Sequence, residues 1–188
     1  MKSISISGGK LFLICAVAAL TLGIINAITE PVIAERKVLE LNNALSSLTG
    51  ELRAAEGVTV KEESVVKAYY PVLKEGKTDS YILELSGVGY GGDMKILSRY
   101  KLDGEIISVK LMDNLETPGL GKKAENPEYM KKFIGLGSSN PVPVRKDMLE
   151  QLEAEAITGA TITFIGIAKA LDQGARFITG GSLAKGRE

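Results

Sequence analysis

The chain has 188 residues with 23 basic and 23 acidic side chains, and 45% of its residues are apolar, enough for one ordinary domain and an additional segment. A net charge of zero without a long basic stripe argues against nucleic-acid binding. With no histidine and one cysteine, the chain offers no imidazole base, CxxC pair or cysteine-ligated metal site, so redox chemistry would need an organic cofactor.

The first predicted element is an apolar span at residues 11–29, which contains no charge. At about 1.5 Å per residue, a helix of this length reaches about 28 Å, close to the hydrocarbon thickness of a bilayer. Lys2 and Lys10 precede the span and give a mild positive-inside bias. The sequence therefore predicts a single-pass anchor in the cell membrane, with residues 1–10 in the cytoplasm and the main domain outside it.

Two other interpretations of this span remain open. A cleaved signal peptide normally has an apolar region of about 7–15 residues and a small-x-small cleavage site. Here the late candidate site, before Ile28, has Ile25 at a position that should be small. Lipoprotein attachment at Cys15 would follow the bulky Ile14 within a longer apolar run. In the anchor interpretation, Cys15 is simply a small apolar residue.

Residues 30–55 are predicted to form a linker helix that rises from the membrane. Apolar residues recur there at helical spacing with charges between them, and Pro31 is placed to kink the junction with the membrane helix. The apolar positions are Ile33, Val38, Leu41, Leu45, Leu48 and Leu52. One face of this helix is expected to pack on the following domain. A coiled coil is the less favoured alternative, because it needs more heptads than this segment contains.

The predicted folded domain covers residues 56–180, and a loose tail follows at 181–188. Three segments alternate apolar and polar residues as antiparallel strands do, and Asp103-Gly104 predicts a turn between the last two. The predicted strands are 80–86, 94–101 and 105–112. Residues 128–134 are predicted as a short helix. The expected fold class is α+β, with a mostly antiparallel sheet and flanking helices.

An amphipathic helix is predicted over residues 162–173, with Gly174 as its stop. Its apolar face consists of Ile162, Phe164, Ile165, Ile167, Ala168 and Leu171. Thr161 fits the N-cap, because its hydroxyl can accept from a backbone N–H of the first turn. A helix N-terminus also suits a phosphate, and Gly159 and Ala160 leave room for close approach. A simple cap and a phosphate site both remain open from this motif alone.

Two glycine-rich segments precede this helix. ETPGLG, residues 116–121, follows the last predicted strand and contains a tight turn at Pro118-Gly119, as an ordinary strand-ending loop also would. GVGYGG, residues 87–92, lies between two strands and does not open a helix, so it is not a dinucleotide fingerprint. Its four glycines indicate close backbone approach to something flat or bulky, with a wide loop as the alternative.

Taken in order, the single span, GYGG, ETPGLG and TGAT opening a helix resemble the G subunit of the Rnf electron-transport complex. That family is related to the C subunit of the sodium-pumping NADH:quinone reductase, and the resemblance covers nearly the whole chain. It implies FMN carried covalently, through a phosphoester to the last threonine of a Ser/Thr-Gly-Ala-Thr motif, here Thr161. A separate flavin transferase makes that bond and reads Asp-x-x-Ser/Thr-Gly-Ala-Ser/Thr. Glu155 stands here at the Asp position, and Asn114 replaces a histidine that usually precedes ETPGLG.

The resemblance also implies where the cofactor lies. The phosphate is expected at the helix N-terminus after Thr161, and the isoalloxazine along the ETPGLG loop. The residues expected at the cofactor are Thr158, Gly159, Ala160, Thr161, Glu116, Thr117, Gly119, Leu120, Gly121, Tyr90 and Gly91. Candidates for neutralising the phosphate are Lys122, Lys123, Arg145 and Lys146.

The implied function is that of an electron-transfer subunit in a membrane-bound, ion-translocating complex. Such a complex moves electrons between ferredoxin and NAD, coupled to sodium or proton transport, and its other subunits would be partners of this chain. No complete catalytic site and no metal site are expected in the chain itself. The alternative is a stand-alone, membrane-anchored flavoprotein that acts as an electron shuttle or reductase, and a flavin-free scaffold is a third class.

Overall fold

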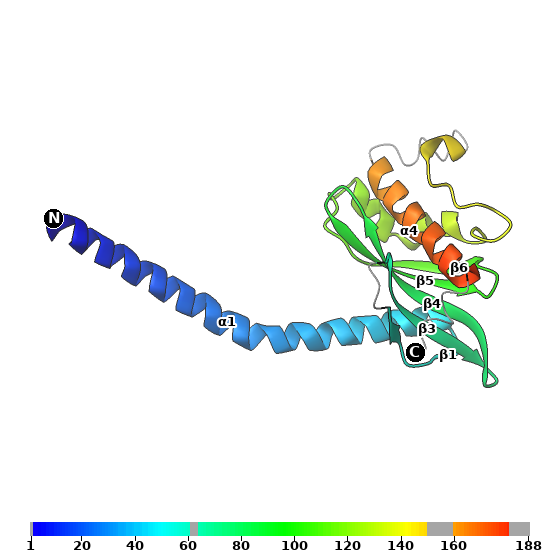
Figure 1. Ribbon diagram of the computed structural model, residues 1–188, viewed down its shortest axis with the longest axis horizontal. Helices are drawn as coiled ribbons and strands as arrows, with labels where there is room; N and C mark the ends of the chain where they lie inside the picture. Colours follow the sequence, from blue (N-terminus) through cyan, green and yellow to red (C-terminus); the bar gives the residue numbers. More distant parts are fainter. Residues whose placement is uncertain (1, 61–63, 150–159, 181–188) are drawn as a thin grey trace. The chain divides into compact units, whose positions relative to one another are not determined.

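The computed structural model describes residues 2–60, 64–149 and 160–180. The chain divides into two units, residues 1–43 and 44–188. The first unit consists of helix α1, which spans Lys2–Thr49 and continues into the second unit. The helix runs without interruption through Pro31, so the predicted anchor and linker form one element (Figure 1).

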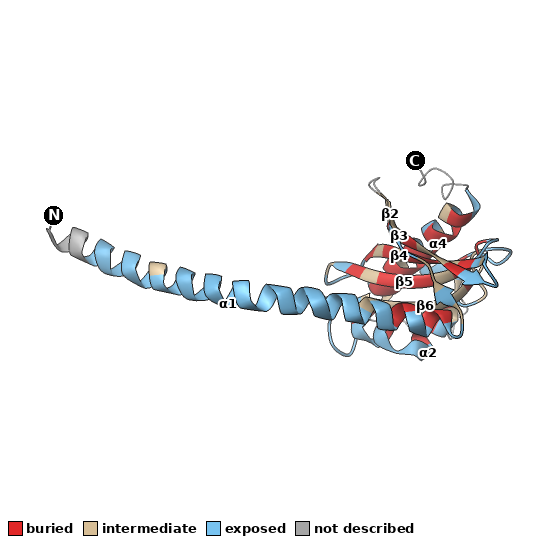
Figure 2. Cartoon of the chain, turned by 90° about the horizontal axis from the view of Figure 1, so that it is seen from below, coloured by how far each residue is buried: buried red, intermediate tan, exposed pale blue. Residues whose placement is uncertain are grey.

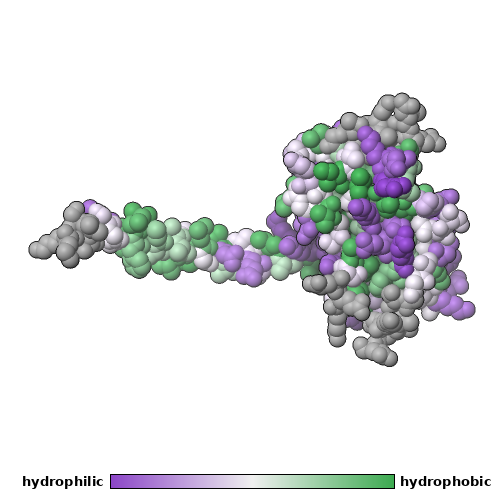
Figure 3. All heavy atoms as spheres, turned by 45° about the horizontal axis from the view of Figure 1, so that its top comes forward, coloured by the Kyte–Doolittle hydropathy of each residue, from purple (hydrophilic) through white to green (hydrophobic). Residues whose placement is uncertain are grey.

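Helix α1 is the one described helix that is long and apolar enough to cross a membrane, judged by length and composition over Ser7–Thr49. Its apolar side chains form a continuous hydrophobic band, visible in Figure 3. The helix ends six residues before the predicted boundary at residue 55. Gly50 ends it, because this glycine adopts a left-handed backbone conformation with φ 63° and its N–H bonds the Ser46 carbonyl oxygen at 3.2 Å.

The second unit is built on a six-stranded sheet in which every described pairing is antiparallel. The strand order is β1-β3-β4-β5-β6, with β2 also beside β3. The strands are β1 Arg53–Ala54, β2 Val58–Thr59, β3 Val66–Lys74, β4 Lys77–Val88, β5 Asp93–Lys101 and β6 Ile106–Asp113. The α+β class is thereby confirmed, and the three predicted strands correspond to β4, β5 and β6.

Strand β3 was not predicted from the sequence. Pro71 lies in its middle, and a proline normally argues against a central strand because it has no N–H to donate. Here the Pro71 carbonyl oxygen accepts from the Ala55 N–H at 2.7 Å, while the residue pairs with Tyr81 on the other side. Strands β1 and β2 pair with only parts of β3. This side of β3 therefore tolerates a proline that has no N–H to donate.

Helix α4, Thr161–Thr179, lies across one face of the sheet and encloses the main hydrophobic core (Figures 1 and 2). The helix continues through Gly174, so the predicted stop there is wrong. A Cβ at this position would lie 2.4 Å from the Tyr100 hydroxyl oxygen, which itself bonds the Leu171 carbonyl oxygen at 3.1 Å. Gly174 thus provides close packing on β5 and does not end the helix.

Short helices connect β6 to α4 and cover the edge of the core. They are η1 Gly121–Glu125, α2 Pro127–Met130, η2 Lys131–Phe133 and η3 Lys146–Met148. The predicted helix at 128–134 corresponds to α2 and η2. Asn126 caps α2, since its side chain accepts from the Glu128 N–H at 3.0 Å. Phe133 is fully buried and stacks on Phe164 of α4, with ring centroids 5.1 Å apart.

The opposite face of the sheet receives the last turns of α1, within the second unit. Side chains that alternate away from α4 are buried there, together with apolar residues of the helix end. They are Val72, Ile82 and Leu97 of the sheet, and Ala44, Leu45 and Leu48 of α1. Residues 44–48 of the predicted linker helix therefore pack on the domain.

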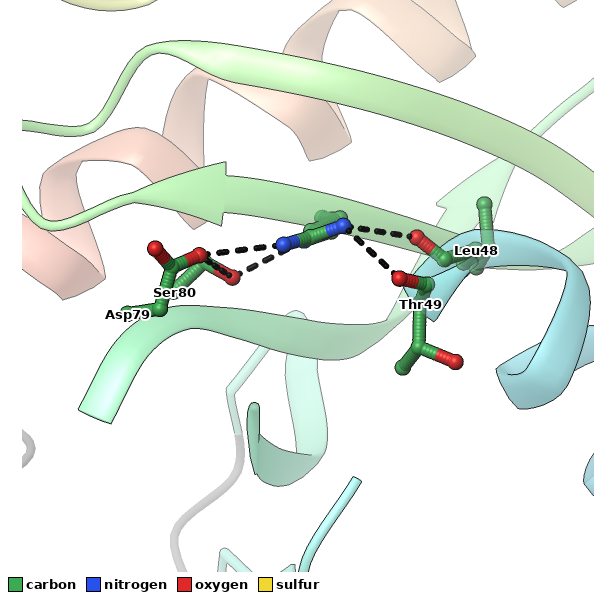
Figure 4. Close-up of polar contacts among 5 residues, drawn as sticks. Leu48, Thr49, Asp79 and Ser80 are labelled. Carbon is green, nitrogen blue, oxygen red and sulfur yellow. Dashed lines mark hydrogen bonds and ion pairs between the residues drawn. The ribbon is translucent and has the colours of Figure 1, made fainter. Parts of the chain in front are cut away.

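Arg99 of β5 fixes this end of α1 (Figure 4). Its Nη1 donates to the carbonyl oxygens of Leu48 and Thr49 at 3.1 and 3.3 Å. Its Nε donates to the Ser80 hydroxyl at 2.8 Å, and its Nη2 pairs with Asp79 at 3.0 Å. Carbonyl groups of a helix C-terminus lack intrahelical donors and carry partial negative charge, so a guanidinium satisfies both needs.

Replacing Arg99 by methionine should lower the free energy of unfolding by about 2 kcal/mol or more, because buried carbonyl groups lose their donor. Denaturant unfolding of the full chain in detergent, followed by circular dichroism, measures the loss. The matched control is Arg176→Met, which removes an exposed (i, i+4) pair with Asp172 and should cost at most about 0.5 kcal/mol. Equal effects of the two substitutions would contradict the assignment.

Candidate functional site

A cavity of about 520 Å³ opens at the start of α4. Its lining joins three segments: the turn between β4 and β5, the loop after β6, and the first turn of α4. The lining residues are Tyr90, Glu116, Thr117, Leu120, Gly121, Ala160, Thr161, Ile162 and Thr163. Its rim is apolar and open to solvent, since Tyr90 is 74% and Ile162 55% exposed.

The start of α4 differs from the predicted cap. The Ala160 carbonyl oxygen accepts from the Phe164 N–H at 2.9 Å, so Ala160 is the N-cap and Thr161 is the first helical residue. The prediction of Thr161 as N-cap was therefore wrong by one position. The backbone N–H groups of the first turn still carry the positive end of the helix dipole beside the cavity.

Glu116 is the buried polar centre of the site, with 3% of its surface exposed. Its Oε1 accepts from the Gly91 N–H at 3.0 Å, and its Oε2 accepts from the Thr163 hydroxyl at 2.6 Å. Its own backbone N–H donates to the Asn114 side-chain oxygen at 3.1 Å. One carboxylate therefore connects the three segments that form the cavity.

The glycines around the site accommodate the chain's own atoms. A Cβ at Gly89 would lie 2.0 Å from Glu116 Oε1, and one at Gly121 would lie 2.1 Å from Glu116 Oε2. A Cβ at Gly91 would lie 2.0 Å from the Leu115 carbonyl oxygen. Gly89 and Gly91 therefore allow the β4–β5 turn to approach the loop that carries Glu116. Gly121 makes room for the Glu116 carboxylate within that loop.

Gly166 lets α4 approach the end of β4. A Cβ there would lie 2.1 Å from the Val88 carbonyl oxygen, and Gly87 lies opposite, where a Cβ would meet the Gly166 carbonyl oxygen at 3.1 Å. Helix and strand therefore touch through their backbones. This contact places the first turn of α4 next to the Gly89–Gly92 turn, where Thr163 can reach Glu116.

The structure brings together most of the residues expected at a cofactor. Of the eleven, seven line the cavity: Tyr90, Glu116, Thr117, Leu120, Gly121, Ala160 and Thr161. Gly91 contacts Glu116 through its N–H, and Gly119 takes φ 79° in the turn after Thr117. Thr158 and Gly159, and also Glu155 of the transferase pattern, lie outside the described residues.

Two cavity residues were not among those expected. Ile162 had been assigned to the core face of its helix, but it is exposed on the rim. Thr163 is 1% exposed and bonds Glu116. A signal for Thr163 existed in the sequence, because a hydroxyl residue in an otherwise apolar helical face needs a polar partner when it is buried.

None of the four candidate phosphate-neutralising cations lines this cavity among the described residues. Lys122 pairs instead with Glu125 at 3.5 Å, and Arg145 with Asp147 at 3.3 Å. Glu125 also accepts from the Asn114 amide at 3.0 Å, and this hydrogen bond lowers the pKa of Glu125 below its ordinary value. Asn114 thereby orders the segment that leads into Glu116.

Comparison with known proteins assigns the class of the domain that contains this cavity. Residues 89–176 match the family model of the FMN-binding domain. The matched segment begins at the β4–β5 turn, includes the loop after β6 and ends within α4, so it contains all described residues of the cavity. The chain therefore carries an FMN-binding domain.

Similar proteins extend over most of the chain. The G subunit of an ion-translocating oxidoreductase complex from Cereibacter sphaeroides is 31% identical, covering 84% of this chain and 76% of its own length. The G subunit of a proton-translocating ferredoxin:NAD(+) oxidoreductase complex from Clostridium ljungdahlii is 27% identical, with coverage of 90% and 89%. Its sodium-translocating counterpart from Acetobacterium woodii is 29% identical, with coverage of 81% of each chain. The chain belongs to the family formed by the G subunits of ion-translocating oxidoreductase complexes.

Substituting Gly166 by alanine tests whether backbone contact positions α4. Alanine favours a helix by about 1 kcal/mol over glycine, but a Cβ pressed on the Val88 carbonyl must displace backbone. We expect a net loss of about 2 kcal/mol in the free energy of unfolding. Thermal unfolding measured beside Lys169→Ala, an exposed position of the same helix, checks this. A stable Gly166→Ala protein would show that the contact is dispensable.

Proposed function

We propose that this chain is the electron-transfer subunit of a membrane-bound, ion-translocating oxidoreductase complex and carries FMN as a phosphoester on Thr161. The observation that supports this most directly is the position of Thr161. It is the first residue of α4 and lines the cavity together with Glu116, Thr117, Leu120 and Tyr90. Bound FMN would supply reversible uptake and release of electrons, which side chains of this composition cannot supply.

The residues of the cavity fit such a cofactor. The volume of about 520 Å³ lies within the range of about 300–1,000 Å³ for small-molecule sites. Apolar and aromatic side chains on the rim suit a flat ring system. The N–H groups at the start of α4 suit a phosphate, and an ester at Thr161 would put it there.

The individual residues then take distinct roles. Thr161 provides the oxygen that forms the P–O bond, made by a separate flavin transferase during maturation. Tyr90 and Leu120, which both line the cavity, would contact the ring. Thr158 and Gly159 complete the Thr-Gly-Ala-Thr motif that ends at Thr161. Glu116 holds the walls in place through its contacts with Gly91 and Thr163.

The partners follow from the relatives, which are subunits of multi-subunit complexes by name. On this proposal α1 anchors the chain in the cytoplasmic membrane, with its N-terminus in the cytoplasm and the FMN-binding domain outside. The chain would pass electrons between neighbouring subunits of a complex that connects ferredoxin and NAD. It would have no substrate site of its own.

Thr161→Ala should abolish covalent flavin, because the ester oxygen is gone, whereas Thr161→Ser keeps a hydroxyl and should retain it. The measurement is flavin fluorescence on a denaturing gel with intact mass, on protein co-expressed with a flavin transferase. The expected addition is FMN less one water. Thr179→Ala, at the other end of α4, is the control and should stay labelled. Label remaining on Thr161→Ala would refute the attachment site.

A further inference from the structure

Glu116 combines deep burial with a connection between segments far apart in sequence. Its two hydrogen-bond donors, Gly91 and Thr163, lie 25 positions before and 47 positions after it. A buried carboxylate without partners would be very unfavourable. Both oxygens accept hydrogen bonds here, and the positive end of the α4 dipole lies at the same cavity.

We propose that Glu116 is the positioning residue of the flavin site: its ionised carboxylate holds the Gly89–Gly92 turn and the ETPGLG loop against the first turn of α4, and its charge makes the bound flavin harder to reduce. This inference rests on the proposed function, since only that function puts FMN in the cavity.

The effect on the flavin follows from elementary electrostatics. Reduction adds electrons to the ring, and a fixed negative charge in the wall of the cavity opposes that addition. Because Glu116 is 3% exposed, water and salt screen its field less than that of a surface carboxylate. Removing the charge while keeping the shape should therefore move the reduction potential to more positive values.

The positioning role has a steric signature that needs no flavin. A Cβ at Gly89 would meet Glu116 Oε1 at 2.0 Å and Cδ at 3.0 Å. The third nearest atom is the Met94 sulfur at 3.0 Å, which belongs to a flexible side chain. Gly89 does not have a positive φ, so the main strain on alanine there comes from the carboxylate that it displaces.

The first measurement is a double-mutant cycle on the flavin-free full chain in detergent. Gly89→Ala should lower the thermal unfolding midpoint by several degrees in the wild type, and much less in Glu116→Ala, where the obstructing atoms are absent. Strong coupling between the two substitutions supports the positioning role. Losses that simply add would overturn it.

The second measurement compares reduction potentials of the FMN-loaded full chain by spectroelectrochemical titration. Glu116→Gln keeps both contacts, since its amide oxygen can accept from Gly91 and its amide nitrogen can donate to Thr163. We expect a more positive potential for Glu116→Gln. The matched control is Glu128→Gln, which removes a carboxylate from helix α2 whose side chain is 70% exposed, and should stay near the wild type. A Glu116→Gln potential equal to the control would overturn the charge effect.

The two measurements separate this inference from the proposed function. A wild type that takes up no flavin refutes the proposed function, and with it the effect on potential. The unfolding cycle still decides whether Glu116 positions the cavity walls. Conversely, labelled protein with additive stability losses keeps the proposed function and removes the positioning role.

Discussion

The seating of α4 on the sheet is the constraint on which the site depends. Gly166 and Gly174 let the helix approach β4 and β5 more closely than any larger residue would allow. Phe164, Ile167 and Leu171 of the same helix are fully buried, and each contributes about 1.5–3 kcal/mol of burial free energy. The helix axis is thereby fixed, and its first turn is held beside the loop that carries Glu116.

Two charged side chains, the half-buried Arg99 and the buried Glu116, then give this packing its register. Hydrophobic contacts are not directional, so they alone leave loops free to shift. Arg99 binds backbone carbonyl groups at the end of α1, while Glu116 binds a backbone N–H and a hydroxyl on the α4 side of the sheet. Each charge connects segments about fifty positions apart and has specific partners. A shift of α1 would leave its last carbonyl groups without this donor, and a shift of α4 would take the Thr163 hydroxyl away from the buried Glu116; each loss is unfavourable.

The sequence predicted elements whose signals are local, and missed those that depend on distant contacts. Alternation located β4 to β6, and the apolar span located α1. Strand β3 was missed because Pro71 contradicts a strand unless its neighbours are known. Gly174 was interpreted as the end of the helix, because the neighbouring sequence does not reveal that Tyr100 packs against it. The sequence motifs predicted most of the residues that line the cavity. The central position of Glu116 could not be predicted, because it depends on the packing of Gly89 and Gly121 against its carboxylate.

The open rim of the cavity gives a physical reason for a covalent bond in the proposed function. Tyr90 and Ile162 remain largely exposed, so a ring resting on them would keep much of its surface in water and gain limited binding energy. An ester at Thr161 makes docking intramolecular, with an effective concentration on the order of millimolar or above. Because Thr161 begins a helix held by Gly166 and by the Glu116–Thr163 bond, the point of attachment has little freedom. An exposed ring on a fixed attachment point is what an electron-transfer partner needs, because it can be approached without opening the protein.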